Sequence, residues 1–216
     1  MTAHAPIPDY AAARQAMVDS QLRPQGVNDP AVIAAMSAVA RERFVPEGQR
    51  PLAYVDRALP LGPGRAMPAP SVTGLLITAL ATLRGESALV VGAGSGYSAA
   101  ILAEMGLNVK ALEAEPELVA AGRKNGVEMV EGSLDQGHAK GAPYDLILID
   151  GAVEYIPDAL VEQLREGGRI GGALIDHGIT RLFIGRRAGG GFGFHSIADS
   201  ATPALPGFER PREFTF

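Results

Sequence analysis

The stretch Leu89-Val90-Val91-Gly92-Ala93-Gly94-Ser95-Gly96-Tyr97 decides the fold of this chain. The apolar residues before Gly92 are typical of a buried parallel strand, and the residues that follow Gly96 favour a helix. Glycine has no Cβ, so the three glycines allow positive φ angles and leave the backbone surface bare. The stretch therefore predicts a strand, a glycine loop and a helix, a common binding place for nucleotide-like cofactors at the carboxyl edge of a sheet.

The spacing of the glycines indicates which cofactor to expect. The dinucleotide fingerprint Gly-x-Gly-x-x-Gly would place its third glycine at position 97, but here it comes at Gly96. This favours S-adenosylmethionine, which has no pyrophosphate to be held at a helix N-terminus. Glu113 ends the next predicted strand, 113 − 92 = 21 positions after Gly92, where an acid can accept hydrogen bonds from both ribose hydroxyls. The alternative is that the glycines make only a tight strand–helix connection.

Composition excludes several classes of protein. The chain has 216 residues, 47% hydrophobic and 20% charged, as in an ordinary globular domain. Its net charge of −5 gives no indication of a nucleic-acid or membrane partner. It has no cysteine, which excludes disulfides, thiolate metal sites and cysteine nucleophiles, and its four histidines show no metal-ligand spacing. Residues 1–9 lack a signal-peptide pattern, so we expect a cytoplasmic protein.

Strands and helices alternate from position 87 onward. Helices are expected earlier, over 9–22, 31–39 and 71–83, while the prolines of residues 44–70 predict an irregular surface layer without regular helix or central strand. Strands are expected at 87–91, 108–112, 127–131, 144–150 and 169–175, with helices at 97–105, 115–123 and 157–165. Residues 181–187 and 192–198 flank three glycines and predict an antiparallel hairpin. The fold class is therefore a doubly wound, mostly parallel seven-stranded α/β sheet with an antiparallel end.

Several segments resemble one known family. They are Met17–Leu22, Arg43-Phe44-Val45-Pro46, Tyr54–Gly62, the glycine loop to Tyr97, Tyr144-Asp145, and the stretch from Pro157 to the Gly-Gly-Arg at 167–169. In this order and spacing the chain resembles the protein-L-isoaspartate O-methyltransferases, which use S-adenosylmethionine to methylate isoaspartyl carboxylates in damaged proteins. The resemblance implies a methyltransferase version of the Rossmann-like sheet and a protein or peptide substrate. It also implies N-terminal helices and a substrate-side loop in residues 1–70, packed on a cofactor-binding domain in residues 71–216.

The chain departs from the family where the chemistry is expected. The family's Gly-Gln-Thr-Ile-Ser-x-Pro is Gly-Arg-Ala-Met-Pro-Ala-Pro here, so Ala66 and Pro68 replace two hydroxyl residues. Val90 replaces an acid before the glycine loop, and Ser133 replaces an aspartate near the adenine. Each lost donor that orients a carboxylate is expected to cost about 2–4 kcal/mol, or 10²–10³ in rate, by analogy with oxyanion-hole deletions.

The resemblance assigns roles to particular residues. Asp56 and Arg65 are the candidate catalytic residues, Arg65 because a guanidinium can bind a substrate carboxylate through two hydrogen bonds. A solvated arginine and a turn-capping aspartate are the respective alternatives. The candidate cofactor-binding residues are Gly92, Ala93, Gly94, Gly96, Tyr97, Glu113, Ser133, Leu134 and Asp150. For Asp150 the alternative is a polar strand end.

Three functions follow from these observations. The first is an active methyltransferase, and the second is a family member that binds the cofactor or a partner without repair activity. The third is a nicotinamide-dependent oxidoreductase, which the position of Gly96 disfavours. The sequence leaves the oligomeric state open.

Overall fold

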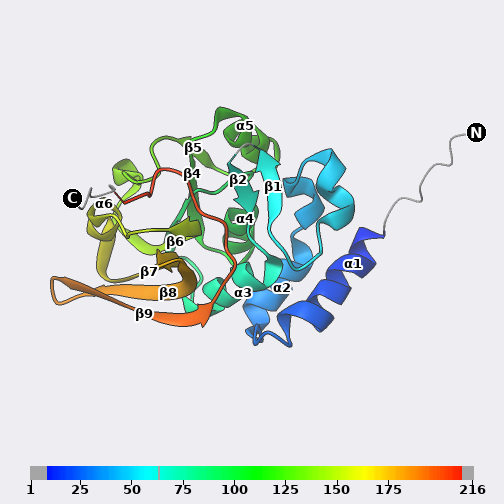
Figure 1. Cartoon of the computed structure of the whole chain (residues 1–216), viewed down its shortest axis with the longest axis horizontal. Helices are drawn as coiled ribbons and strands as arrows, with labels where there is room; N and C mark the ends of the chain where they lie inside the picture. The colour runs from blue at the N-terminus through cyan, green and yellow to red at the C-terminus, as the bar shows by residue number, and fades with distance from the viewer. Residues whose placement is uncertain (1–8, 63, 211–216) are drawn as a thin grey trace, which may run out of the picture.

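A seven-stranded sheet forms the centre of the molecule (Figure 1). The computed structural model describes residues 9–62 and 64–210. The strands of the sheet are β3 (Ser87–Val91), β4 (Asn108–Glu113), β5 (Met129–Glu131), β6 (Tyr144–Val153), β7 (Leu164–Asp176), β8 (Ile179–Ala188) and β9 (Gly191–Asp199). Their order is β5-β4-β3-β6-β7-β8-β9, parallel from β5 to β7 and antiparallel from β7 to β9. This confirms the predicted fold class and the antiparallel hairpin.

The central strands are apolar because both faces of the sheet are covered. Residues 88–91 of β3 and 146–149 of β6 are almost fully buried, as expected for parallel strands with helices on both sides. Strand β3 lies between β4 and β6, so its carboxyl end, where the glycine loop begins, is at the middle of the sheet edge. The predicted position of the loop is therefore confirmed.

The α-helices flank the sheet, and the first two begin at a capping aspartate. They are α1 (Tyr10–Met17), α2 (Pro30–Ala38), α3 (Pro70–Ala79), α4 (Tyr97–Glu104), α5 (Pro116–Lys124) and α6 (Asp158–Glu162). The side chain of Asp9 accepts hydrogen bonds from two backbone N–H groups of α1, and Asp29 does the same for α2. A π-helical turn over Val18–Leu22 extends α1 to the predicted end of the first helix. Two predicted helices are too long, since α3 ends at Ala79 and α6 at Glu162.

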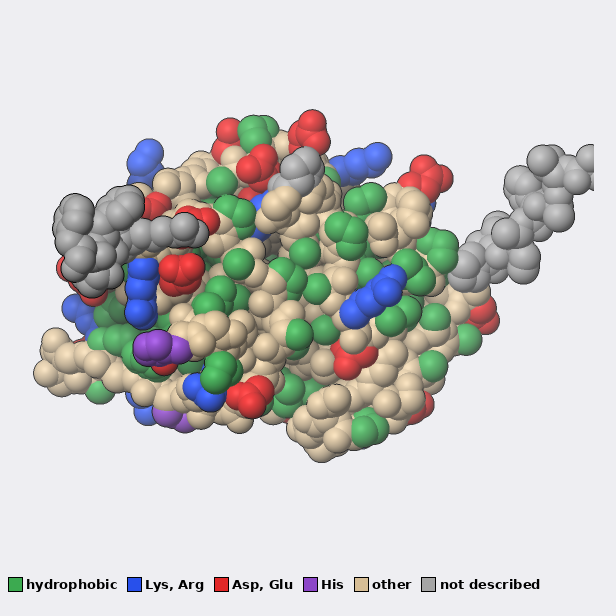
Figure 2. Space-filling view, viewed as in Figure 1, with side chains coloured by type: hydrophobic (Ala, Val, Ile, Leu, Met, Phe, Trp, Pro, Cys, Tyr) green, Lys and Arg blue, Asp and Glu red, His purple; other side chains and the backbone are tan. Residues whose placement is uncertain are grey.

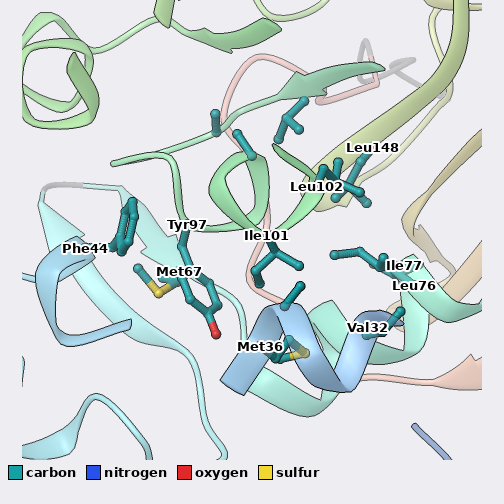
Figure 3. Close-up of a cluster of buried hydrophobic side chains, with 14 of the residues drawn as sticks. Val32, Met36, Phe44, Met67, Leu76, Ile77, Tyr97, Ile101, Leu102 and Leu148 are labelled. Carbon is teal, nitrogen blue, oxygen red and sulfur yellow. The ribbon is translucent and has the colours of Figure 1, made fainter. Parts of the chain in front are cut away.

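A hydrophobic core joins the N-terminal helices to the sheet (Figure 3). Met36 of α2, Ile77 of α3 and Ile101 of α4 are buried together against Leu148 of β6. A second buried cluster contains Leu89, Tyr144, Ile170 and Phe208. Among the described residues no helix is both long and apolar enough to cross a membrane.

The proline-rich segment contains regular structure that the sequence analysis did not expect. Residues Leu59–Gly62 form β1 and Arg65–Met67 form β2, which pair as an antiparallel hairpin separate from the main sheet. The prediction of an irregular surface layer was wrong here, because a two-stranded ribbon leaves one side of each strand unpaired and so accepts proline. Leu59 and Met67 are also buried rather than exposed. Pro63 lies outside the described residues.

The last described residues, 200–210, follow β9 as an extended segment that we call the C-terminal strap. The Leu205 N–H donates to Ala152 O (2.7 Å) and the Ala152 N–H donates to Pro203 O (2.9 Å), so the strap adds to the end of β6. Leu205 and Phe208 anchor it in the second buried cluster. In Figure 1 the strap is the red trace that leaves β9 and crosses the face of the molecule. The final Phe214-Thr215-Phe216 lies outside the described residues.

Candidate functional site

The glycine loop connects β3 to α4 with the backbone geometry that its sequence predicts. The φ angles of Gly92, Gly94 and Gly96 are 72°, 56° and 96°, all in the left-handed region. An L-residue is strained in this region, so the loop requires glycine at these positions. Gly96 is the N-cap residue of α4, and the Gly92 N–H donates to the carbonyl oxygen of Leu112 at the end of β4.

Glu113 lies at the predicted place beside this loop, and both oxygens of its carboxylate already accept hydrogen bonds from the protein. Its Oε2 accepts from the Gly94 N–H (2.7 Å) and from Nη2 of Arg65 (2.5 Å). Its Oε1 accepts from the N–H groups of Ala114 (2.9 Å) and Glu115 (3.2 Å). The carboxylate is fully buried. Glu113 therefore has the right position for a ribose-binding acid, but its oxygens already accept four hydrogen bonds from the protein.

Arg65 reaches the glycine loop from strand β2. Besides its ion pair with Glu113, its Nη2 donates to the carbonyl oxygen of Gly92 (3.0 Å). The side chain is buried, and its Nε has no hydrogen-bond partner among the described residues. The solvated loop arginine considered above is thus not what the structure shows. Arg65 does bind a carboxylate, but this carboxylate belongs to the protein itself.

The bare surface of the loop contacts side chains of the chain itself. A Cβ atom at Gly92 would lie 2.7 Å from both Cδ atoms of Leu205 in the strap. A Cβ at Gly94 would lie 2.6 Å from Cδ1 of Leu61 in β1. Two leucines from segments far apart in the sequence therefore use the close approach that these glycines permit.

A cavity of about 230 Å³ lies on the outer side of the Arg65–Glu113 pair. Ser133 and Leu134 line it from the turn after β5, and Pro206 and Gly207 line it from the strap. The Ser133 hydroxyl donates to Asp135 (2.7 Å). Of the predicted cofactor-binding residues, Glu113, Ser133 and Leu134 thus line one cavity, which is smaller than the roughly 300–1,000 Å³ of typical small-molecule sites.

Asp150 is near the end of β6, close to the same cluster. Burial raises the pKa of its carboxyl to about 6, while the Ser98 hydroxyl and the charges of Arg65 and Arg41 oppose this shift. The nearby charge of Glu113 raises the pKa further. Asp150 is 7% exposed, so it is a buried acid beside the glycine loop and not a solvated strand end.

The remaining predicted residues line other parts of the structure. Asp56 accepts a hydrogen bond from the Ser71 N–H (3.0 Å) and so caps α3 from a distant loop. Tyr97 is buried in the core, where its ring meets Phe44 edge-on at 5.6 Å between centroids (Figure 3). Ala93 is buried within the loop. The structure therefore brings Arg65, Glu113 and the glycines together, and it places Asp56 in a capping contact.

Arg41 is a buried polar residue that the sequence analysis missed. Its Nε donates to Ala53 O (2.8 Å), its Nη2 donates to Pro68 O (2.6 Å), and its guanidinium lies 4.6 Å from the centroid of the Tyr97 ring. It thus ties the segment after the hairpin to the helix that follows the glycine loop. The only signal in the sequence is its place two residues before the matching Arg43-Phe44-Val45-Pro46 segment.

The residues that would hold S-adenosylmethionine fit it in type, but in this conformation other side chains of the chain already contact the loop and the acid. The glycine loop, the acid after β4 and the adjoining cavity correspond to a nucleoside site at the carboxyl edge of a parallel sheet. Leu205 and Leu61 cover the loop, and Arg65 takes the acid. Figure 2 shows mostly green hydrophobic and tan atoms over the middle of the face that the strap crosses, with charged side chains to the left and right of it and along the upper rim.

Comparison with known proteins gives one consistent family. Residues 12–173 match the model of the protein-L-isoaspartate(D-aspartate) O-methyltransferase family. A protein-L-isoaspartate O-methyltransferase from Methylorubrum extorquens is 43% identical over 171 residues, which are 76% of this chain and 75% of that protein. A second, from Rhodopseudomonas palustris, is 41% identical over 179 residues, covering 77% and 73% of the two chains.

Solved structures show the same fold. A protein-L-isoaspartate O-methyltransferase superposes with a TM-score of 0.78 at 21% identity, over 90% of this chain and 66% of that one. A β-aspartate methyltransferase from Plasmodium falciparum, solved in complex with S-adenosyl-L-homocysteine, gives a TM-score of 0.76 at 20% identity, over 92% and 99% of the chains. At these identities the structural likeness concerns the fold.

Proposed function

The chain belongs to the protein-L-isoaspartate O-methyltransferase family, and from this we propose that it uses S-adenosylmethionine to methylate isoaspartyl carboxylates in damaged proteins. One observation carries the proposal: the family match runs from the first helix through β7 and includes the whole strand, loop and helix of the glycine motif. The retained acid at Glu113 supports it. The proposal includes a cytoplasmic location and a protein or peptide substrate.

The proposed chemistry asks little acid–base catalysis of the protein. A carboxylate is ionised at pH 7, so no general base is needed to make it a nucleophile. The protein's contribution is then to align the carboxylate and to exclude water. S-adenosylmethionine would supply the methyl group. Because the cleft is filled in this conformation, we assign no catalytic step to Asp56 or Arg65, and their catalytic roles stay predictions.

The two other functions have less support. The family match does not favour a nicotinamide-dependent oxidoreductase. A member that binds without catalysis differs from the proposed enzyme only in turnover. This second function is still tested because the chain has Ala66 and Pro68 where we expect the family's hydroxyl residues.

Methyl transfer from labelled S-adenosylmethionine tests the proposal directly. The full chain should label a peptide that contains isoaspartate and should not label the matched peptide with ordinary aspartate. A chain with Ala66→Thr and Pro68→Ser should transfer faster, by about 10²–10³ for each orienting donor regained. If neither chain transfers methyl groups above background at high protein concentration, the enzyme proposal is wrong and the binding function replaces it.

A further inference from the structure

The C-terminal strap crosses the carboxyl edge of the sheet where a cofactor is expected. Parallel sheets bind ligands in the crevice beyond the carboxyl ends of their central strands. Here that crevice lies between β3 and β6, and the strap extends the end of β6 through the Leu205–Ala152 and Ala152–Pro203 hydrogen bonds. Pro206 of the strap also reaches the turn of the β1–β2 hairpin, since a Cβ at Gly64 would lie 3.8 Å from its ring.

Leu205 fills the space in front of the first glycine. A Cβ at Gly92 would lie 2.7 Å from its Cδ atoms, and a Cβ at Gly151 would lie 3.0 Å from its Cβ. The side chain is only 3% exposed. It therefore sits between the end of β3 and the end of β6, in direct contact with backbone that a ligand of the glycine loop would have to touch.

Arg65 occupies an acceptor position of Glu113 that a bound ribose would need. A ribose bound at Glu113 would present hydroxyl donors to a carboxylate whose oxygens already accept from Arg65 and from three backbone N–H groups. Since a carboxylate offers about four acceptor positions, the ribose can bind only if one donor leaves. Arg65 is the only one of the four that is a side chain, and side chains rotate more easily than backbone.

From these contacts we propose that the chain occludes its own cofactor cleft: Leu205 of the strap and Arg65 of β2 form a plug that S-adenosylmethionine must displace. This inference rests on the proposed function, because it concerns the site of the proposed cofactor. The family match ends at residue 173, so the strap lies outside the matched region. The hydroxyl-to-alanine departure is at the position after Arg65, and the hydroxyl-to-proline departure is three positions after it.

Two features make the plug removable without unfolding the sheet. The strap joins the sheet beyond the point where β6 and β7 change register, so its release leaves the pairing of β3, β4 and β6 in place. Arg65 lacks a partner for Nε among the described residues, so its closed position does not satisfy all of its donors. A closed state of this kind weakens the apparent affinity of the cofactor by the fraction of molecules that are open.

Calorimetric binding of S-adenosylhomocysteine to the full chain tests the proposal. Leu205→Ala and Arg65→Gln should each bind it at least about tenfold more tightly than the wild type, and the double variant more tightly still. The controls Leu83→Ala and Arg50→Gln change an exposed leucine and an exposed arginine and should bind as the wild type does. Equal affinity in the wild type and both plug variants, or no binding by the double variant, would overturn the proposal.

A thiol probe tests the plug without relying on turnover. The chain has no cysteine, so Leu205→Cys carries one thiol, and Leu83→Cys provides an exposed reference. The thiol at 205 should react at least about 10²-fold more slowly than the reference, as a buried group does, and S-adenosylhomocysteine should speed its reaction.

The thiol result and the methyl-transfer result together separate the two proposals. A thiol at 205 that reacts as fast as the reference would overturn the plug while methyl transfer by the wild type still supports the enzyme. A protected thiol whose reaction rate saturating S-adenosylhomocysteine leaves unchanged would likewise overturn it. Protection relieved by S-adenosylhomocysteine supports the plug, and the absence of methyl transfer in the same preparation would then count against the enzyme alone.

Discussion

The central strands and the segments that cover their carboxyl ends are organised in different ways. Strands β3, β4 and β6, which we call the framework, are held by regular parallel registers, and β3 and β6 are apolar and buried at residues 88–91 and 146–149. The β1–β2 hairpin and the strap, which we call the cover, have only short pairings. Leu59, Met67 and Phe208 bury the cover in the two core clusters, and Leu61, Arg65 and Leu205 contact the glycine loop and Glu113. The framework therefore fixes where a ligand can bind, and the covering segments decide whether the space is open.

The residues expected at the cofactor site are divided between these two regions. The glycine loop and Glu113 follow or end central strands and keep the positions of a nucleoside site. Arg65 and Ala66 lie in β2 and Pro68 follows it, so these three belong to the covering segments. The expected departures from the family's pattern fall in both regions, since Val90 is in β3 and Ser133 follows β5.

We expect the largest effect from removing the negative charge of Glu113, because its ion pair with Arg65 joins the cover to the framework. Glu113→Gln leaves the buried guanidinium of Arg65 without its partner and turns an amide N–H₂ toward N–H donors. Breaking a buried ion pair on one side costs about 3–5 kcal/mol, so the free energy of unfolding in urea should fall by that amount. Glu131→Gln changes an exposed residue at the end of β5 and serves as the control. A loss below about 1 kcal/mol would show that the pair does not tie the cover to the framework.

Asp150 gives a smaller effect that depends on pH. Its pKa is raised to about 6 by burial, above the 3.8 of an unperturbed aspartate. The folded protein therefore holds this proton more tightly than the unfolded chain, and stability must fall as pH rises from about 4 to 6. The free energy of unfolding of the wild type, relative to Asp150→Asn, should decrease by about 2–3 kcal/mol between pH 4 and pH 7.

The pH series has a simple control. Leu83→Ala changes an exposed leucine and no titratable group, so its free energy of unfolding should differ from that of the wild type by a nearly constant amount. The wild type and Asp150→Asn could instead differ in free energy of unfolding by the same amount at every pH in this range. That result would mean that the carboxyl of Asp150 is not buried beside the glycine loop.

The smallest expected effect measures the contact between the strap and the loop. Gly92→Ala places a Cβ against Leu205. It also puts an alanine in the left-handed region, at a φ of 72°, where its backbone is strained. In a Leu205→Ala background the clash disappears and the strain remains, so the cost of Gly92→Ala should be lower by about 1 kcal/mol. Gly85→Ala has a similar φ of 88° with open space around it, so its cost should not depend on residue 205. Additive effects of Gly92→Ala and Leu205→Ala would exclude the contact.

The sequence predicts the framework because each of its elements has a local signal. Val90 and Val91 indicate a buried strand, the three glycines indicate the turn, and Pro30 and Asp29 mark a helix start. The position of Glu113 follows from the length of one helix and one strand after Gly92. All of these are properties of short stretches, so spacing is enough.

The cover depends on contacts between distant residues and has no such signal. Arg65 meets Glu113 over 48 positions in the chain, and Leu205 meets Gly92 over an even longer separation. The prolines of residues 44–70 suggested an irregular layer because proline counts against a central strand, but they do not exclude an isolated hairpin. The motif makes Asp56 a catalytic candidate, which stays a prediction, and its contact with the Ser71 N–H is visible only in three dimensions.

A crystal structure of the full chain grown with S-adenosylhomocysteine tests the central claim most directly. We expect the nucleoside beside Gly92 and Gly94, its ribose hydroxyls on Glu113 in place of Arg65, and Leu205 displaced from the loop. A ligand bound at another place, or Leu205 and Arg65 seated as they are now at saturating ligand, would contradict the account.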